Sequence, residues 1–588
     1  MSLLNRRTLA AAAGAGLAVA ASTSPRPTAA APPEPADLVL RNGRIVTMDP
    51  ARPSAEALAA RGETIVAVGS WPEVEPFVGP RTEVIDLGGR LAVPGLIEGH
   101  GHFTGIGETR LGLDLTQARS WDQIVAMVAQ AAAAAAPGEW IVGRGWHQEK
   151  WTSPPAPAVE GFPVHASLSR VSPRNPVLLE HASGHAAFVN GQALERGGIG
   201  RRTRPPAGGE ILRDSRGEPT GLLRETAAGP VEQALADARD RRTPAQVEAH
   251  FRKVVELATR ECLSKGITSF QDAGSSFETI DGLERLADEG ALGLRLWVMV
   301  RDDPPALAEK LARYRTVGGG AKRLTVRAIK HSLDGALGSR GAWLLAPYSD
   351  LAESTGLETT PLAVIEETAR LALRHGYQLC VHAIGDRANR ETLDLFERAF
   401  RARGNGKDLR WRIEHAQHLH PADIPRFGAL GVIAAMQGIH ATSDGPWVPR
   451  RLGERRTAEG AYVWQKLLGG GAVIANGTDA PVEDVNPIAS FYASVSRRLP
   501  DGSVFHADQR MSREQALRSY TIDAAFAAFE DESKGSLVPG KLADVTVLSR
   551  DIMSVPEAEI PGTEVVYTVL GGKVAYKKDS AATRSIRP

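Results

Sequence analysis

Alternating apolar and polar residues mark both ends of the chain. Between Asp37 and Val84, short segments of this kind are separated by Gly and Pro turns, which is typical of antiparallel strands. Similar segments return near the C-terminus at 544–548, 564–569 and 573–576. Because neither group has enough strands to bury a core alone, we predict one β-sandwich built from residues 37–90 and 535–577. Residues 578–588 follow as a tail.

The middle of the chain alternates short apolar runs with helical patterns. We interpret as strands the runs 91–97, 267–271, 294–300, 326–330, 378–382, 411–415, 432–437 and 473–477. Capping boxes at Thr243–Gln246 and Ser512–Gln515 mark helix starts. Eight strands with intervening helices predict an α/β fold, a (β/α)8 TIM-like barrel over residues 91–534. Residues 105–242 are too many for a βα loop, so we predict an insertion after the first strand that covers the site.

The first residues have the composition of an export signal. An arginine pair, Arg6-Arg7, precedes an alanine-rich apolar stretch, and small residues follow at 29–31. This order predicts a twin-arginine-type signal peptide over residues 1–31, and therefore an exported protein, periplasmic or extracellular. A tail with a chance arginine pair is the alternative. The apolar stretch is too short for a stable membrane anchor.

Composition excludes some classes of partner. Lys and Arg total 69, as do Asp and Glu, so the formal net charge is zero and nothing indicates binding to nucleic acid. Cys262 and Cys380 lie in no metal-ligand or redox spacing, which predicts two buried free thiols. A small-molecule substrate is the expected partner, and a homodimer remains open.

Candidate metal ligands fall at the ends of the predicted strands, where a TIM-like barrel carries its functional side chains. His100 and His102 follow the first apolar run, and residues two apart on an extended chain point the same way. Imidazole is the commonest protein ligand for zinc. Later strand ends carry Lys330, His382, His415 and Asp479. Singly, each is more often an ordinary polar residue or a helix cap, but together they favour a metal site.

Longer motifs resemble those of the metal-dependent amidohydrolase superfamily, specifically its YtcJ-like branch (amidohydrolase family 3). The resemblance rests on Val93–His102, Gly184–Asn190, Gly266–Gly274, Leu333–Arg340, Val381–Asn389 and Gly535–Asp544. It covers nearly everything after residue 31, and it implies hydrolysis of a non-peptide C–N bond in an amide, formamide, N-acyl amine or cyclic amide. Gln271 departs from a frequent histidine and Thr478 from a frequent serine. These departures keep the ligand set but make it unsafe to transfer a substrate from relatives.

The resemblance implies a complete ligand set. Its members are His100, His102, Lys330, His382, His415 and Asp479. Lys330 falls where binuclear members carry a carboxylated lysine between two metals, which implies two Zn²⁺ per chain. Burial lowers the pKa of a lysine amine and favours its reaction with CO₂. A salt bridge from unmodified Lys330 to Asp334 or another carboxylate is the alternative, and an unmodified Lys330 would accompany a mononuclear, deaminase-like site. The neighbouring His331 should point away from the barrel interior.

Catalytic roles also follow from the resemblance. Asp479 would act as general base toward a metal-activated water and then protonate the leaving amine. His185 from the insertion, or His382, would help to polarise the scissile carbonyl. His147 and His181 are weaker candidates for contact with the substrate. An exported binding protein without catalysis, built on the same barrel, is the remaining alternative.

Aromatic residues in the insertion and after later strands favour an apolar or aryl substituent on the substrate. The rings are Trp140, Trp146, Trp151, Trp447 and Tyr462. We predict that Trp146 and Trp151 contact the substrate, although core packing explains any one of them equally well. Arg340 would bind a substrate carboxylate, or else pair within the protein.

Overall fold

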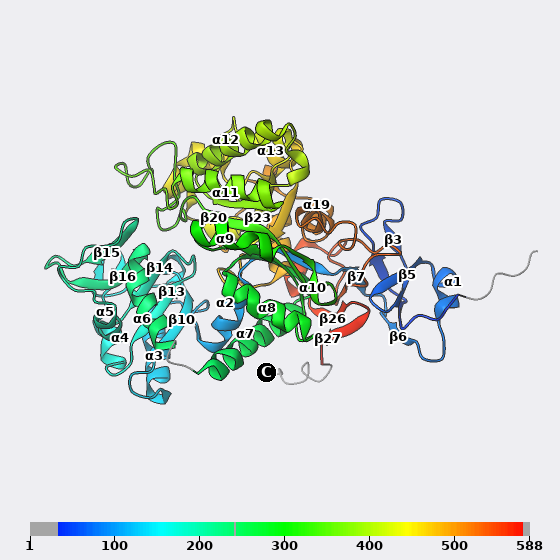
Figure 1. The fold of residues 1–588 in the computed structure, drawn as a ribbon, viewed down its shortest axis with the longest axis horizontal. Coiled ribbons are helices and arrows are strands. Elements are labelled where there is room, and N and C mark those ends of the chain that lie inside the picture. The colour runs from blue at the N-terminus through cyan, green and yellow to red at the C-terminus, as the bar shows by residue number, and fades with distance from the viewer. Residues whose placement is uncertain (1–32, 240–242, 580–588) are drawn as a thin grey trace, which may run out of the picture.

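The computed structural model describes residues 33–239 and 243–579. The predicted signal peptide over residues 1–31 therefore lies outside the described residues. Three lobes lie in a row along the longest axis, with the barrel between the insertion and a two-sheet domain (Figure 1). Within the described ranges, no helix combines the length and the hydropathy needed to cross a bilayer.

Eight parallel strands form the central barrel. In hydrogen-bonded order they are β8 (Leu96–Gly101), β17 (Ile267–Ser275), β18 (Arg295–Val300), β20 (Leu324–Ser332), β21 (Gln378–Ala383), β22 (Arg412–His415), β23 (Ile433–Gln437) and β24 (Ile474–Gly477). The circle nearly closes between the last strand and the first, where the Asp479 amide donates to the His100 carbonyl at 2.8 Å. The strands are almost wholly buried, as expected when helices cover the barrel and side chains fill it. The predicted TIM-like barrel is confirmed.

Local sequence signals set the helices that surround the barrel. Helix α7 (Pro244–Ser264) begins at the Thr243 capping box, and α19 (Arg513–Ser519) begins at the Ser512 box, as predicted. The other long barrel helices are α8 (Phe277–Asp288), α9 (Pro304–Tyr314), α11 (Leu362–His375), α12 (Asp386–Arg403) and α18 (Pro487–Ser496). Cys262 and Cys380 are buried free thiols, also as predicted.

The first predicted strand, 91–97, is two strands in the structure. Strand β7 (Leu91–Pro94) pairs with the strands of the two-sheet domain, and only β8 belongs to the barrel. Gly95 joins them at a crossing where a Cβ would lie 2.2 Å from the Thr268 hydroxyl, so only glycine fits. An unbroken apolar run hides this change of sheet, because both cores bury the same residue types.

Both ends of the chain contribute to the two-sheet domain. One sheet has the order β5 (Thr64–Gly69), β4 (Ala57–Arg61), β1 (Leu38–Arg41), β6 (Glu83–Asp86). The other has the order β27 (Lys573–Lys577), β26 (Val565–Leu570), β25 (Val545–Leu548), β7, β2 (Arg44–Val46), β3 (Ser54–Ala55). Leu40 and Val547 lie in one shared core. A buried ion pair at 2.8 Å between Arg295 and Asp544 fastens this domain to the barrel.

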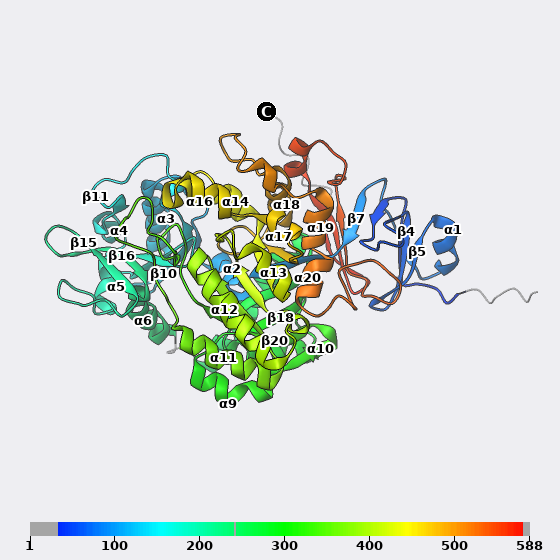
Figure 2. The same cartoon turned by 90° about the horizontal axis from the view of Figure 1, so that it is seen from above.

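The insertion is built around a sheet of its own. In order, its strands are β15 (Gly209–Arg213), β16 (Pro219–Glu225), β14 (Ala186–Val189), β13 (Val177–His181), β10 (Ile141–Trp146) and β9 (Leu113–Asp114). Helices α3 (Trp121–Ala134) and α6 (Gly229–Arg239) pack with it (Figure 2). The ends of β10 and β13 and the start of β14 meet the carboxyl ends of the barrel strands, because His147, His181 and His185 line a cavity there.

Candidate metal centre

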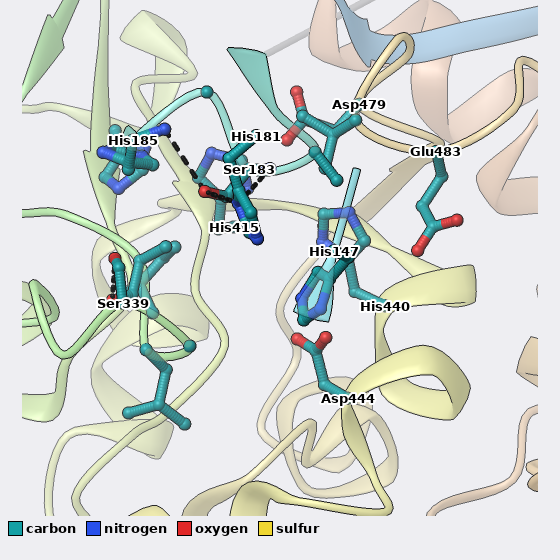
Figure 3. A pocket seen from close by; sticks show the side chains of 18 of the residues that line it. His147, His181, Ser183, His185, Ser339, His415, His440, Asp444, Asp479 and Glu483 are labelled. Atoms are coloured by element: carbon teal, nitrogen blue, oxygen red, sulfur yellow. Dashed lines mark hydrogen bonds between the residues drawn. The ribbon is translucent and has the colours of Figure 1, made fainter. Parts of the chain in front are cut away.

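The six predicted ligands gather at the carboxyl ends of the barrel strands. Five of them line one cavity of about 310 Å³, and His100 is fully buried behind it. His100 lies on β8, His102 directly after it, and Asp479 just beyond β24. Residues separated by almost four hundred positions therefore meet where the barrel closes. Figure 3 labels Asp479 and His415 among the side chains that line this cavity.

Three of these side chains converge without bonding to one another. Asp479 Oδ1 lies 3.4 Å from His100 Nε2 and 3.2 Å from His102 Nε2. Both His100 Nε2 and Asp479 Oδ1 are buried and have no hydrogen-bond partner among the described residues. The donor atoms of the three side chains lie within 4.8 Å of one another. Nitrogen and oxygen donors in this arrangement fit a divalent cation such as zinc.

A second group of donors shares Asp479. It joins Asp479 with His415 and His440, whose donor atoms again lie within 4.8 Å of one another. The His382 ring lies 4.4 Å from that of His415, and His382 Nε2 is a further buried atom without a partner in the described chain. Sequence reasoning missed His440, which lies on α14 (Gly438–Asp444), three residues after β23 ends. Reading the first turn after each strand would have found it.

A buried ion pair orients His100. Glu414 accepts a hydrogen bond from His100 Nδ1, and Arg412 holds Glu414 through two bonds of 2.7 and 2.9 Å. Because Nδ1 carries the proton, Nε2 presents its lone pair to the metal position. Burial alone would raise the pKa of Glu414, but Arg412 and His100 hold it below its ordinary value. The sequence shows only that Arg412 and Glu414 share one face of the strand.

His415 is held in a similar way. Its Nδ1 lies 2.8 Å from Gln437 Oε1, and since an amide oxygen only accepts, Nδ1 is the donor. His440 has the opposite arrangement, because Gln417 Nε2 donates to His440 Nδ1 at 3.0 Å. The proton of a neutral His440 is then on Nε2, which faces the cavity as a hydrogen-bond donor. This favours contact with a substrate over metal ligation for His440.

The two departures from the family pattern lie behind the cavity wall. Gln271 is buried, accepts from Arg412 and donates to the Ala524 carbonyl at 2.7 Å. The Thr478 hydroxyl and amide both donate to Glu98, at 3.1 and 2.5 Å. Burial raises the pKa of Glu98 to about 8. Gln271 and Thr478 therefore support the ligands and do not line the cavity.

Burial sets the protonation of the candidate ligands. It lowers the pKa values of His102, His382 and His415, which keeps these imidazoles neutral as metal ligation requires. Burial also lowers the pKa of Lys330 to about 8. An appreciable fraction of the Lys330 amine is then neutral near pH 7, and the neutral amine is the form that reacts with CO₂.

The alternative salt bridge from Lys330 to Asp334 is not formed. The Asp334 carboxylate instead accepts backbone amide protons from Trp343, Ile384 and Gly385 at 2.8 to 2.9 Å. His331 points away from the barrel, as predicted, and its Nε2 lies 2.8 Å from the Thr368 hydroxyl on α11.

The insertion supplies a histidine–glutamate pair to the cavity. His185 Nδ1 lies 2.9 Å from Glu225 Oε2, and the His185 ring lies 5.7 Å from that of His382. Glu225 has φ 49° and ψ −130°, a strained conformation that is typical of functional positions. Burial alone would lower the pKa of His185, but Glu225 raises it above its ordinary value.

Two further histidines from the insertion line the cavity. The rings of His147 and His181 lie 4.6 Å apart, and burial lowers the pKa of His147 to about 3. Figure 3 shows His185 and Ser339 on one side of the cavity and His440, Asp444 and Glu483 on the other. Asp444 accepts a hydrogen bond from Tyr462 at 2.6 Å, and burial raises its pKa to about 6.

Most of the rings singled out from the sequence lie away from this cavity. Trp146 is fully buried in the insertion core, where its indole donates to the Leu179 carbonyl at 2.8 Å. Trp151 stacks on Trp146 with ring centroids 6.1 Å apart and lies outside the cavity. Of the five rings singled out from the sequence, Trp447 alone lines the cavity. Helical and strand patterns cannot distinguish a buried tryptophan from one that faces a substrate.

Arg340 is also placed differently from the prediction of a carboxylate contact. Its Nη2 lies 3.1 Å from Asp350 Oδ2, which is the internal pair that the sequence left open. Arg340 lines a neighbouring pocket and does not reach the cavity that holds the candidate ligands.

Comparison with known proteins places the chain in a family. A model of the amidohydrolase family matches residues 83–576. Protein LONG AFTER FAR-RED 3 of Arabidopsis thaliana is 34% identical, with 92% of each chain covered. Putative amidohydrolase YtcJ of Bacillus subtilis is 29% identical over 92% of this chain and 99% of its own. N-substituted formamide deformylase of Arthrobacter pascens is 27% identical over 92% of this chain and 98% of its own.

Among solved structures, an uncharacterized metal-dependent hydrolase from Pyrococcus horikoshii superposes with a TM-score of 0.70. It is 25% identical, with 89% of this chain and 99% of that chain covered. The barrel, the histidines at its strand ends and the family match agree. This chain belongs to the amidohydrolase family, as its motifs predicted, and it is a metal-dependent hydrolase.

Proposed function

We propose that this enzyme hydrolyses the C–N bond of an amide, formamide, N-acyl amine or cyclic amide, with two Zn²⁺ ions bound at the strand ends. The observation that carries this proposal is the convergence of buried donor atoms without partners, His100 Nε2, His382 Nε2 and Asp479 Oδ1, beside one cavity. The similarity to an N-substituted formamide deformylase favours formamides among these substrates.

The ions would be held by the six residues at the strand ends. These are His100, His102, Lys330, His382, His415 and Asp479. We propose that Lys330 is carboxylated and that its carbamate would be one of the ligands that hold the ions. Its neutral amine attacks CO₂, a C–N bond forms, and the ammonium proton leaves to water, which gives an anionic oxygen ligand. The lowered pKa of Lys330, about 8, makes this reaction accessible at neutral pH.

A bound divalent metal supplies Lewis acidity and a water that is deprotonated at neutral pH. Asp479 acts as general base because its carboxylate is ionised and lies beside His100 and His102. After attack on the carbonyl carbon, Asp479 returns the proton to the leaving nitrogen as the C–N bond breaks. Protonated His185, held by Glu225, donates a hydrogen bond to the carbonyl oxygen as negative charge develops there.

Two alternatives predict different results from metal analysis combined with an activity screen. A mononuclear, deaminase-like enzyme would hold one metal and an unmodified Lys330. A binding protein without catalysis would show metal but no turnover that depends on Asp479. The low pKa of Lys330 and the lack of an ion pair between Lys330 and Asp334 favour the binuclear enzyme.

The test combines metal analysis of the purified protein with a screen of formamides, N-acyl amino acids and cyclic imides. We expect about two metal ions per chain and at least one substrate whose turnover is lost in D479N. Absence of bound metal after purification without chelators would contradict the proposal. The Glu289→Gln variant changes an exposed residue far from the cavity and serves as the control.

Export and assembly are separate proposals. We propose that the protein is periplasmic or extracellular, on the composition of residues 1–31 alone. Cell fractionation of the full chain and of an Arg6→Lys, Arg7→Lys variant tests this. A homodimer stays a hypothesis that sedimentation of the purified enzyme would test.

A further inference from the structure

The cavity contains one cationic side chain that neither an acidic partner nor the metal proposal accounts for. Its lining includes Arg144, Lys150, Arg301 and Lys330. Arg144 is paired with Glu180, Lys150 lies 3.8 Å from Glu483, and Lys330 is a candidate metal ligand. No carboxylate of the described chain lies within 4.0 Å of Arg301, which leaves a free positive charge at the cavity wall.

The structure holds Arg301 in place by its backbone and its stem. It directly follows β18, and its amide donates to the Ser275 carbonyl at 2.8 Å. Gly274 has φ +136°, and a Cβ there would lie 2.8 Å from the Arg301 Cδ. A residue with a side chain at position 274 would therefore collide with the arginine. The motif that contains Gly274 thus makes room for the Arg301 stem.

The guanidinium is nearly unused within the protein. Its only side-chain hydrogen bond among the described residues runs from Nη2 to the Ser332 hydroxyl, at 3.3 Å. The next two residues of the chain are acidic but do not reach it. Asp302 accepts from the Phe277 amide at 3.2 Å, and Asp303 accepts from the Ala306 amide at 2.8 Å. Both carboxylates face helix starts, so the donors of Arg301 remain available.

Ser332, the hydrogen-bond partner of Arg301, lies on the strand that carries Lys330. Ser332 is two residues beyond Lys330 on β20, and both line the cavity. Alternate residues of a strand share a face and lie about 7 Å apart. An anion bound at the Arg301 guanidinium, beside Ser332, would therefore lie about one short substrate length from Lys330. Guanidinium is the side chain best suited to a carboxylate, because its planar N–H groups match both oxygens.

We propose that Arg301 and Ser332 form a carboxylate-binding subsite, so that this enzyme acts on amides that bear a carboxylate, such as N-acyl amino acids. Arg301 holds the carboxylate through charge-assisted hydrogen bonds, and Ser332 holds the guanidinium in place. This inference rests on the proposed hydrolysis of a C–N bond and selects one class among its substrates.

The test uses a pair of probes that differ only in the charge. N-formylphenylalanine carries the carboxylate, and N-formylphenethylamine has hydrogen in its place. Release of formate reports cleavage of the same bond in both. We expect wild-type holoenzyme to favour the carboxylate by about 10- to 100-fold in kcat/KM, the ordinary range for a charge-assisted bond. R301Q should lose this preference because kcat/KM falls for the acid and stays unchanged for the amine probe. R301K should keep part of the preference.

Matched variants and a binding readout keep the outcomes distinct. Arg313→Gln removes an exposed arginine on α9, outside the cavity, and should leave the preference unchanged. Equal loss for both probes in R301Q, or no preference in the wild type, would overturn the carboxylate subsite. If no form of the enzyme releases formate, formamides are not its substrates, and calorimetry then decides. Tighter binding of the acid that R301Q abolishes would support the subsite, and equal or absent binding would overturn it.

Discussion

Replacing Glu414 by glutamine tests how the buried network prepares the metal centre. Glu414 accepts hydrogen bonds from two donors, the Arg412 guanidinium and His100 Nδ1. Glutamine preserves the shape but has one acceptor and one donor in place of two acceptors. If its oxygen faces His100, its amide hydrogens oppose Arg412. If its oxygen faces Arg412, its NH₂ donates to His100 Nδ1 and moves the imidazole proton to Nε2.

The expected size of the effect follows from burial. Arg412 and Glu414 are both 0% exposed, and breaking a buried ion pair costs about 3–5 kcal/mol because one charge is left uncompensated. The proton on Nε2 would also block the lone pair that faces the metal position. Loss of such a support for a ligand lowers metal affinity by about 10- to 100-fold.

The protein also contains an exposed arginine–glutamate pair that is joined by two hydrogen bonds. Arg252 binds Glu289 through bonds of 2.7 and 2.9 Å, the same two distances as the buried pair, but both side chains are at least 40% exposed. Glu289→Gln should change the free energy of unfolding far less than Glu414→Gln, because water solvates and screens this pair, and it should leave metal affinity unchanged. Urea unfolding of the metal-free proteins gives the free energies of unfolding, and competition with a fluorescent chelator gives the affinities. Equal effects of the two substitutions on metal affinity would refute the role assigned to Glu414.

Three further outcomes are expected. Asp479→Asn should lower kcat by about 10²- to 10⁴-fold, the usual contribution of a general base, measured by release of product from the best substrate of the screen. Uptake of metal by metal-free enzyme at a fixed concentration of dissolved CO₂ should accelerate about 10-fold from pH 7 to pH 9 if the pKa of Lys330 is about 8, because the neutral fraction of its amine rises from about 9% to about 91%. An ordinary lysine, with pKa about 10.4, would give about 100-fold, so stopped-flow metal uptake separates the two. Glu225→Gln removes the carboxylate that raises the pKa of His185, so His185 loses its proton at lower pH. The alkaline limb of the kcat/KM profile should therefore move to lower pH. Glu210→Gln, in an exposed pair on β15, should leave the profile in place.

The sequence was sufficient for the barrel and for the residues at its strand ends, for a physical reason. Parallel strands bury both faces, so they read as apolar runs, and a polar residue at the end of such a run stands out. His382 and His415 are visible in this way because each ends or nearly ends a buried strand. Their meeting in space follows from the closed barrel, which brings all carboxyl ends of the strands to one rim.

Other features depend on contacts that no local pattern records. Trp146 fills the insertion core and Arg340 pairs with Asp350, although both residue types are equally suited to a substrate. His440 lies one helical turn beyond its strand, where no apolar run ends. Arg301 becomes informative only when the structure shows that the acidic residues beside it face other partners.

The unpartnered atoms of the site connect stability with function. A buried polar group without a hydrogen bond costs about 1–3 kcal/mol, and His100 Nε2, His382 Nε2 and Asp479 Oδ1 each carry such a cost among the described residues. The surrounding structure does not let these atoms turn toward other partners, since Glu414 holds His100 and the backbone near Asp479 is fixed to β8. Cations held at the strand ends would remove these costs together. Because such cations would bind only the folded chain, the free energy of metal binding would also stabilise the barrel.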